Sequence, residues 1–156
     1  MYASSGLSPA IYGLAGTKLT RAEETFFSGV RPYGFILFAR NCQDPRQVRA
    51  LTDSLRALTK RNNLPILIDQ EGGRVARLKP PHWPEFPAAG IFAALATVSS
   101  ENAKQAVYIN ARLIAAELYE LGISVDCAPL ADIPVDGAHD IIGDRAYFHR
   151  ILPERQ

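Results

Sequence analysis

The sequence predicts an α/β fold built on a parallel sheet, and three of its features support this prediction. Short apolar segments alternate with amphipathic segments along most of the chain. The apolar segments at 34–38 and 64–68 are continuous, which is typical of strands that are buried on both faces of a parallel sheet. Both segments end in polar residues, and the sites of parallel sheets usually lie at the carboxyl ends of their strands.

The first half of the chain predicts two strand–helix units. The apolar, glycine-containing segment 11–16 precedes Thr20, which forms a capping-box pattern with Glu23 and so predicts the start of a helix. The second strand precedes Asp44 and Pro45, the residue types that favour the N-cap and the first position of a helix. Apolar residues then recur at helical spacing, as an amphipathic helix requires.

The second half predicts a third strand at 64–68, a stiff proline-containing loop at 75–87, a helix over 101–121 and a fourth strand at 123–127. We expect the inward face of that helix to comprise Ala106, Ile109, Leu113, Ala116 and either Leu118 or Tyr119. Alternating strands and helices imply right-handed parallel units. Four such units suit either an open doubly wound sheet or half of an eight-unit barrel, and periodicity does not choose between them.

The composition of the chain limits the classes of function that it can have. A chain of 156 residues with 47% hydrophobic and 21% charged residues is typical of one globular domain. Its 17 basic and 16 acidic residues give a net charge of +1, which argues against nucleic-acid and anionic-membrane partners. Cys42 and Cys127 lack the spacing of a zinc site, and the chain shows neither a leader pattern nor a membrane-length apolar run. We therefore expect a cytoplasmic protein.

A first polar cluster, at 69–74 with Arg77 beyond it, follows the third predicted strand. A carboxylate there accepts hydrogen bonds from vicinal sugar hydroxyls, and a guanidinium donates to hydroxyl or carboxylate oxygens. Gly72 and Gly73 allow a tight turn, but they do not form a phosphate-binding loop, which disfavours a nucleotide-binding protein. A charged loop with internal ion pairs is the alternative interpretation.

A second polar cluster lies near the end of the chain and comprises Asp126, Asp132, Asp136, His139, Asp140, Asp144 and Arg145. Carboxylates with one histidine are possible metal ligands, but their spacing matches no metal loop, so Asx turns are the favoured explanation and we expect no metal. The chain has no GxSxG nucleophile motif. Trp83, beside His82, is suited either to stack on a sugar or to pack the loop.

Together, the motifs resemble the bacterial β-N-acetylhexosaminidases of glycoside hydrolase family 3. The motifs are GFILFARN at 34–41, IDQEGGRV at 68–75, PHWP at 81–84, DCAP at 126–129 and GDR at 143–145. Their order and separations agree with that family over about residues 10–147. The resemblance implies the N-terminal half of a (β/α)8 TIM-type barrel, with Asp69, Arg77 and Arg145 as substrate-binding residues and no cofactor.

The activity implied by the resemblance is removal of terminal non-reducing β-N-acetylglucosamine from muropeptides during peptidoglycan recycling in the cytoplasm. The mechanism implied is retaining hydrolysis, with an aspartate nucleophile and a histidine acid/base. In the family both catalytic groups and a Lys-His sugar-binding pair lie downstream of GDR, so we expect this chain to lack catalytic residues and to be inactive alone.

The sequence after residue 147 departs from the family pattern. We therefore divide the chain into a half-barrel at 1–147 and an atypical tail at 148–156, which suggests a truncated or frameshifted product. The alternative is a non-catalytic module that binds N-acetylglucosamine. We expect the full-length form to be monomeric, whereas an open half-barrel exposes a strand edge near 123–127 and is prone to self-association.

Overall fold

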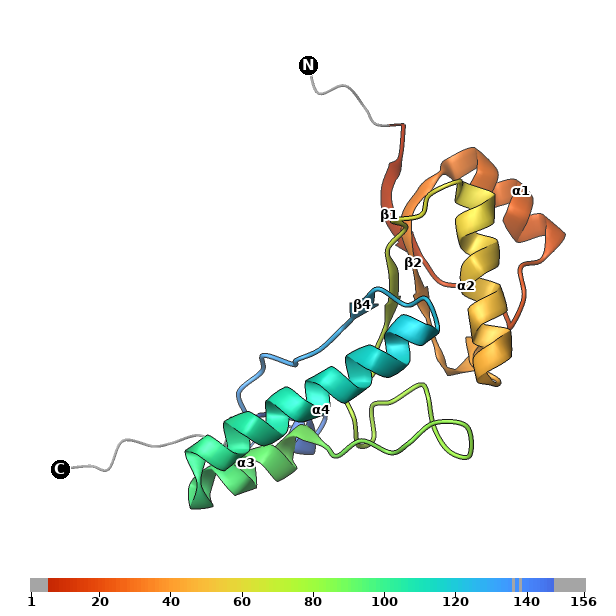
Figure 1. Ribbon diagram of the computed structural model, residues 1–156. Coiled ribbons are helices and arrows are strands. Elements are labelled where there is room, and N and C mark those ends of the chain that lie inside the picture. The colour runs from red at the N-terminus through yellow and green to blue at the C-terminus, as the bar shows by residue number, and fades with distance from the viewer. Residues whose placement is uncertain (1–5, 136, 138, 148–156) are drawn as a thin grey trace.

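A computed structural model describes residues 6–135, 137 and 139–147, and the tail predicted at 148–156 lies outside them. A parallel four-stranded sheet is formed by β1 (Ser8–Tyr12), β2 (Pro32–Leu37), β3 (Ile66–Ile68) and β4 (Val125–Asp126) (Figure 1). The helices are α1 (Arg21–Val30), α2 (Pro45–Thr59), α3 (Ala89–Val98) and α4 (Ser100–Glu120). Two 3-10 turns, η1 (Ala39–Asn41) and η2 (Gly143–Arg145), complete the elements.

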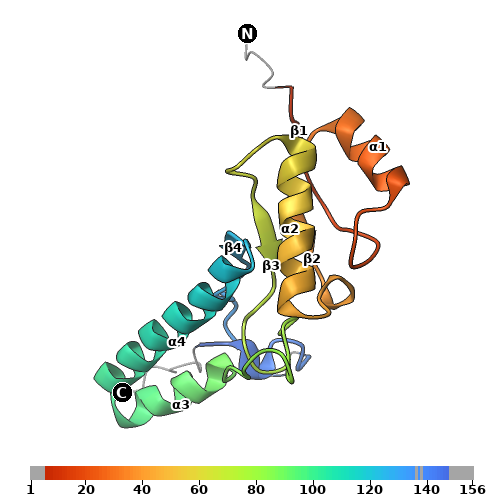
Figure 2. The same ribbon diagram turned by 45° about the vertical axis from the view of Figure 1, so that its right-hand side comes forward.

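The strand order distinguishes between the two predicted architectures. The strands lie in the order β1-β2-β3-β4, so each new strand is added on the same side of the preceding one. With right-handed crossovers this winding puts every connecting helix on one face of the sheet, whereas a doubly wound sheet reverses direction and has helices on both faces. Figure 2 shows α1 and α2 side by side along β2 and β3. The order therefore supports part of a barrel.

The two predicted helix starts are confirmed. The Thr20 hydroxyl accepts a hydrogen bond from the Glu23 backbone N–H at 3.2 Å, and the Glu23 carboxylate accepts one from the Thr20 N–H at 2.9 Å. Asp44 accepts from the Gln47 N–H at 2.9 Å. These side chains satisfy backbone donors that the first turn of each helix leaves free.

The hydrophobic core lies between the sheet and helices α1 and α2, and it continues to the carboxyl end of α4. Phe35 is paired with Ile66, and Leu37 with Ile68, so these four side chains point to the same face, and all are fully buried. Helix α2 covers them with Val48, Leu51 and Leu55. Phe27 of α1 packs edge-on against Phe35, with ring centroids 4.9 Å apart.

In the second half of the fold the strands are shorter than predicted, at Ile66–Ile68 and Val125–Asp126, and the helices differ from the prediction in two respects. Helix α3 was not predicted, because its sequence AGIFAALATV is apolar all round and has no capping side chain at Ala88. In addition, most of the predicted inward face of α4 is wrong: Ile109, Leu113, Ala116 and Tyr119 are exposed. The buried stripe is Ala103, Asn110, Ile114 and Leu118, since α3 and the preceding core contact that side of the helix.

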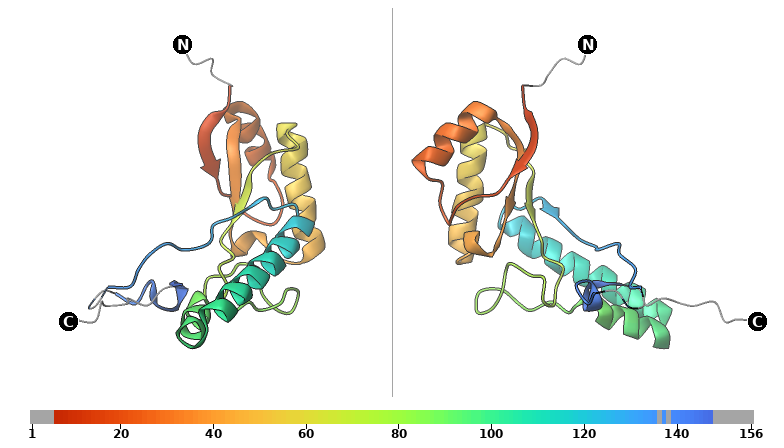
Figure 3. Two further views of the ribbon diagram at one scale, coloured as in Figure 1. Left: turned by 60° about the vertical axis from the view of Figure 1, so that its left-hand side comes forward. Right: turned by 180° about the vertical axis from the view of Figure 1, so that it is seen from behind.

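Helices α3 and α4 lie against each other and extend away from the α1–α2 layer (Figure 3). The carboxyl end of α4 remains attached to α2 through polar contacts. Thr52 donates to the Leu121 carbonyl at 2.7 Å, and Arg56 donates to the Gly122 carbonyl at 2.7 Å. Among the helices that the structure describes, none has the length and apolar character needed to cross a membrane.

Candidate functional site

The residues predicted to bind substrate lie just beyond the carboxyl ends of β3 and β4. Asp69 follows β3 directly and accepts a hydrogen bond from Arg77 Nη2 at 2.6 Å. Both side chains are about one quarter exposed, at 23% and 25%. The predicted pair is therefore brought together, with both members open to solvent on one side.

Gln70 holds the loop that carries Arg77. Its side chain is buried, and its Oε1 accepts hydrogen bonds from the backbone N–H groups of Arg77 at 2.9 Å and Leu78 at 3.0 Å. Its Nε2 donates to the Leu78 carbonyl at 3.1 Å. The two bonds to Leu78 are buried and the bond from the Arg77 N–H is partly buried, so together they fix the position of the Arg77 backbone.

Arg145 reaches the site through Glu71. Its Nη2 and Nε donate to the two carboxylate oxygens of Glu71 at 2.8 Å and 2.9 Å. The two side chains are 20% and 11% exposed. Hydrogen bonding to Glu71 raises the pKa of Arg145, and the negative charges of Glu71, Asp132 and Asp69 add to the effect. Arg145 is therefore held as a cation beside the β3 loop.

Arg74 fastens the turn that carries Arg145. Its Nε donates to Asp144 at 2.8 Å, and its Nη2 donates to the carbonyls of residues 140, 141 and 142 at 2.9–3.0 Å. Gly143 has a positive φ of 44°, and a Cβ at this position would lie 2.6 Å from Asp140 Oδ1. A side chain here would be strained at this φ and would displace the Asp140 carboxylate, so the turn and the arginine that holds it form one unit.

The paired glycines of the β3 loop are also required by its shape. Gly72 has φ 92°, and a Cβ there would lie 2.3 Å from the Pro87 carbonyl oxygen. Gly73 has φ 56° and donates its backbone N–H to the Phe86 carbonyl at 2.8 Å. The loop thus folds back against the chain that precedes α3, which explains the tight turn expected from the sequence.

Asp126 ends β4 and adds a third carboxylate to the site. Its Oδ1 accepts a hydrogen bond from the Gln70 backbone N–H at 3.0 Å. Burial raises the pKa of Asp126 to about 6, the hydrogen bond from Gln70 opposes this shift, and the charges of Asp69 and Glu71 favour it. Three carboxylates against two guanidinium groups leave the site well supplied with hydrogen-bond acceptors.

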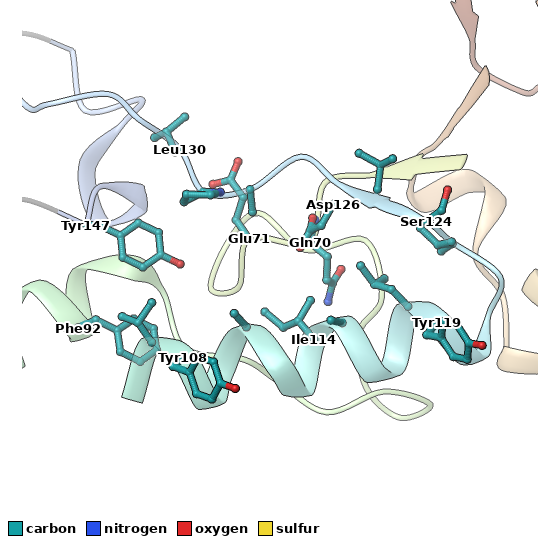
Figure 4. A pocket seen from close by; sticks show the side chains of 18 of the residues that line it. Gln70, Glu71, Phe92, Tyr108, Ile114, Tyr119, Ser124, Asp126, Leu130 and Tyr147 are labelled. Atoms are coloured by element: carbon teal, nitrogen blue, oxygen red, sulfur yellow. The ribbon is translucent and has the colours of Figure 1, made fainter. Parts of the chain in front are cut away.

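A large cavity extends from these carboxylates along α4. Its volume is about 1340 Å³. Figure 4 shows Gln70, Glu71 and Asp126 between β4 and α4, with Tyr147 towards one end and Tyr119 at the other. The polar end offers donors and acceptors, whereas most of the α4 side is apolar. Among residues 6–135, 137 and 139–147, no three His, Cys, Asp or Glu side chains are grouped to hold a metal ion.

The structure joins the two sequence clusters that were predicted separately. Arg145 of the second cluster lies against Glu71 of the first, and Asp126 bonds to Gln70. Internal ion pairs, the alternative interpretation of the first cluster, are also present. Trp83 is buried in the core, so it packs the loop and does not offer a face to a sugar.

Sequence reasoning did not identify Gln70, Glu71 and Arg74 as residues that hold the site together. The contacts of Glu71 and Arg74 join segments that are far apart in sequence: the Glu71–Arg145 pair is separated by 74 residues. The sequence does show that both clusters contain acidic and basic residues. This allows ion pairs between the clusters but does not specify which residues form them.

Comparison with known proteins identifies relatives over nearly the whole chain. The glycosyl hydrolase family 3 N terminal domain matches residues 17–150. The β-hexosaminidase of Alkalilimnicola ehrlichii is 40% identical over 144 residues, covering 92% of this chain and 40% of that protein. The β-hexosaminidase of Nitrosomonas eutropha is 33% identical, again with 40% of that protein covered. The chain thus spans about 40% of the length of these curated relatives.

Solved structures show the same fold. NagZ from Neisseria gonorrhoeae in complex with N-trifluoroacetyl-D-glucosamine superposes with a TM-score of 0.84 at 30% identity, over 92% of this chain and 42% of that one. A β-N-acetylglucosaminidase of the same hydrolase family from Paenibacillus superposes with a TM-score of 0.75 at 30% identity, over 89% of this chain and 26% of that one.

Proposed function

The chain belongs to glycosyl hydrolase family 3, and on this basis we propose that it supplies the substrate-binding part of an enzyme that hydrolyses terminal β-N-acetylglucosamine. Asp69, Arg77 and Arg145 are the residues proposed to bind the sugar. The observation that carries this proposal is the cluster beyond β3 and β4, where Asp69 pairs with Arg77 and Glu71 holds Arg145.

The cluster suits a neutral sugar. Each guanidinium is already paired with a carboxylate, so its charge is balanced before a ligand arrives. The remaining N–H groups and carboxylate lone pairs suit hydroxyl and amide groups, which need donors and acceptors and no net charge. N-acetylglucosamine has both kinds of group, and a solved relative carries an N-acylated glucosamine.

For the complete enzyme we propose retaining hydrolysis of muropeptide sugars during peptidoglycan recycling in the cytoplasm. A retaining mechanism needs a nucleophile and an acid/base group on opposite sides of the scissile bond. The family resemblance locates both beyond Arg145 in sequence. This chain is therefore proposed to bind the sugar and to need further residues for turnover.

The test is a sugar titration of the isotope-labelled 156-residue chain, followed by amide NMR and run beside a hydrolysis assay with a chromogenic β-N-acetylglucosaminide. We expect N-acetylglucosamine to shift the signals of Asp69, Arg77 and Arg145, with no product released. Arg77→Lys should abolish the shifts, because a point charge does not reproduce the planar guanidinium contact with Asp69.

Arg46→Lys is the matched control, since Arg46 is exposed on α2 and does not line the cavity. Its titration should equal that of the parent chain. Absence of any shift in the parent chain overturns the binding assignment. If a homogeneous sample of this chain forms product, the proposal that the catalytic groups lie outside this chain is wrong.

A further inference from the structure

Arg74 and Arg145 donate hydrogen bonds to the same stretch of backbone. Nη2 of Arg74 donates to the carbonyls of residues 140, 141 and 142 at 2.9–3.0 Å. Arg145 uses two of these carbonyls: its backbone N–H donates to the Ile142 carbonyl at 2.9 Å, and its Nη1 donates to the Ile141 carbonyl at 3.3 Å. A carbonyl oxygen has two lone pairs and accepts from both arginines. The carbonyls that Arg74 holds are therefore the ones that orient Arg145.

The Arg145 guanidinium is held from two sides. Glu71 accepts from its Nε at 2.9 Å and from its Nη2 at 2.8 Å, whereas Nη1 donates to the Ile141 carbonyl. Only the contact with Ile141 depends directly on Arg74. Loss of the Arg74 side chain leaves Glu71 in place, but it releases the backbone from which Arg145 extends.

The ion pair of Arg74 is expected to matter less than its contacts with the carbonyls. Nε of Arg74 donates to Asp144 at 2.8 Å, and the two side chains are 45% and 52% exposed. Exposed pairs of this kind contribute little, because water and salt screen the charges. The carbonyl contacts are made while Asp144 holds Nε, which the planar fork of a guanidinium allows and the single nitrogen of a lysine does not.

We propose that Arg74 is a positioning residue for sugar binding, which acts through the carbonyls of residues 140–142 and not through its charge pair with Asp144. These carbonyls determine where the Arg145 guanidinium lies, and Arg74 itself needs no contact with the sugar. The inference rests on the function proposed above, in which Arg145 binds the sugar.

The first experiment follows the Arg145 side chain by NMR of the isotope-labelled chain without sugar. The Arg145 Nε–H is bonded to Glu71, so it should exchange slowly with solvent in the parent chain. Arg74→Ala should speed this exchange about tenfold, whereas the amides of the fully buried residues Phe35 and Leu37 should not change. A general loss of stability would speed the exchange of all three groups, which separates positioning from a purely structural role.

The second experiment repeats the N-acetylglucosamine titration on variants. Arg74→Ala should weaken binding about tenfold, and Arg74→Lys nearly as much, because neither side chain reproduces the carbonyl contacts. Asp144→Asn should weaken it less than about twofold. The matched control is Arg112→Ala, which removes an exposed arginine that donates to the Tyr108 hydroxyl at 3.1 Å on the same helix. Its affinity should equal that of the parent chain.

A double substitution tests whether Arg74 acts through Arg145. Arg145→Gln removes the guanidinium, and in this background Arg74→Ala should cause no further loss of affinity. A full further loss would show that Arg74 contacts the sugar directly or acts on another group, and would overturn the proposal. A larger loss in Asp144→Asn than in Arg74→Lys would also overturn it, because the charge pair would then be the main contact.

The positioning role and the proposed function fail separately. If the parent chain does not bind the sugar, the proposed function is wrong, and the exchange of the Arg145 Nε–H still decides whether Arg74 positions that side chain. If Arg74→Ala binds the sugar as well as the parent chain does, the positioning role is wrong and the proposed function stands.

Discussion

Around β2 and β3 the fold is held by apolar packing, whereas around β4 the apolar contacts of Leu118, Leu121 and Ile123 are supplemented by polar contacts. Phe35 and Ile66 are fully buried beneath α1 and α2. On the other side, Leu113 of α4 is 55% exposed, and the carboxyl end of α4 is joined to α2 through Thr52 and Arg56. The candidate site lies where these two regions meet.

This difference explains how a partial barrel supports an ordered site. Apolar packing fixes β2 and β3, and the position of β3 determines where the loop after it begins. Directional hydrogen bonds from Gln70, Glu71 and Arg74 then hold the segments that come from the less packed region. Removing packing should therefore unfold the chain, whereas removing a polar contact should loosen the site first.

The largest contrast is expected between the two kinds of apolar residue. Phe35→Ala removes a fully buried ring and should lower the free energy of unfolding by about 3–5 kcal/mol. Leu113→Ala, on the exposed side of α4, should change it by less than about 0.5 kcal/mol. Urea titration followed by circular dichroism measures both. Similar losses would contradict the division into a packed and an open region.

The ion pairs provide the next contrast. Glu71→Gln removes the negative charge that pairs with Arg145, and both side chains are largely buried. The substitution should lower the free energy of unfolding by about 1.5–3 kcal/mol. Asp53→Asn breaks the Arg49–Asp53 pair, whose side chains are more than half exposed, and should cost only about 0.3–0.5 kcal/mol. High salt should reduce the effect of Asp53→Asn more than that of Glu71→Gln, because exposed charges are screened more strongly. The same urea titration, repeated at high salt, measures this.

Gln70→Ala tests the hydrogen bonds inside the β3 loop. It leaves the N–H groups of Arg77 and Leu78 without their side-chain acceptor, at a cost of about 1–3 kcal/mol. It should also weaken sugar binding, since the hydrogen bond that fixes the Arg77 backbone is lost. Gln105→Ala, at an exposed position on α4, is the control for both measurements. Unchanged sugar affinity in Gln70→Ala would mean that the loop does not need Gln70 to place Arg77.

Local signals in the sequence predicted much of the packed region. Continuous apolar segments marked β2 and β3, and Thr20 and Asp44 marked the starts of α1 and α2 because N-cap chemistry depends on a few adjacent residues. Helix α3 lacked both periodicity and a cap, so no local signal identified it. The face of α4 was misassigned because its apolar residues surround the helix, and only the arrangement of its neighbours decides which side is buried.

The candidate site shows the same division between local and distant information. Asp69 and Arg77 belong to one loop, so their proximity was predictable from sequence. The contact between Glu71 and Arg145 depends on how η2 folds back over the β3 loop, which Arg74 and Gly143 determine. Such contacts between distant segments follow from tertiary structure and not from residue spacing.

Asp126 lies at the boundary between the two regions. Burial raises the pKa of this carboxyl from 3.8 to about 6. Between these values the folded chain binds more protons than the unfolded chain, so the contribution of Asp126 to stability falls as the pH rises from about 4 to 6. Asp126→Asn keeps an oxygen that accepts from the Gln70 N–H and removes the ionisation.

The variant should therefore match the parent chain near pH 4 and be more stable at pH 7.5. Because solvent screens this partly exposed group, the gain should be about 1 kcal/mol, well below the full value of the shift. Urea titrations at both pH values measure it, with Glu85→Gln as the exposed control. A variant that is less stable than the parent at pH 7.5 would show that the charge of Asp126 stabilises the boundary, and that the polar region depends on ionised carboxylates as well as on hydrogen bonds.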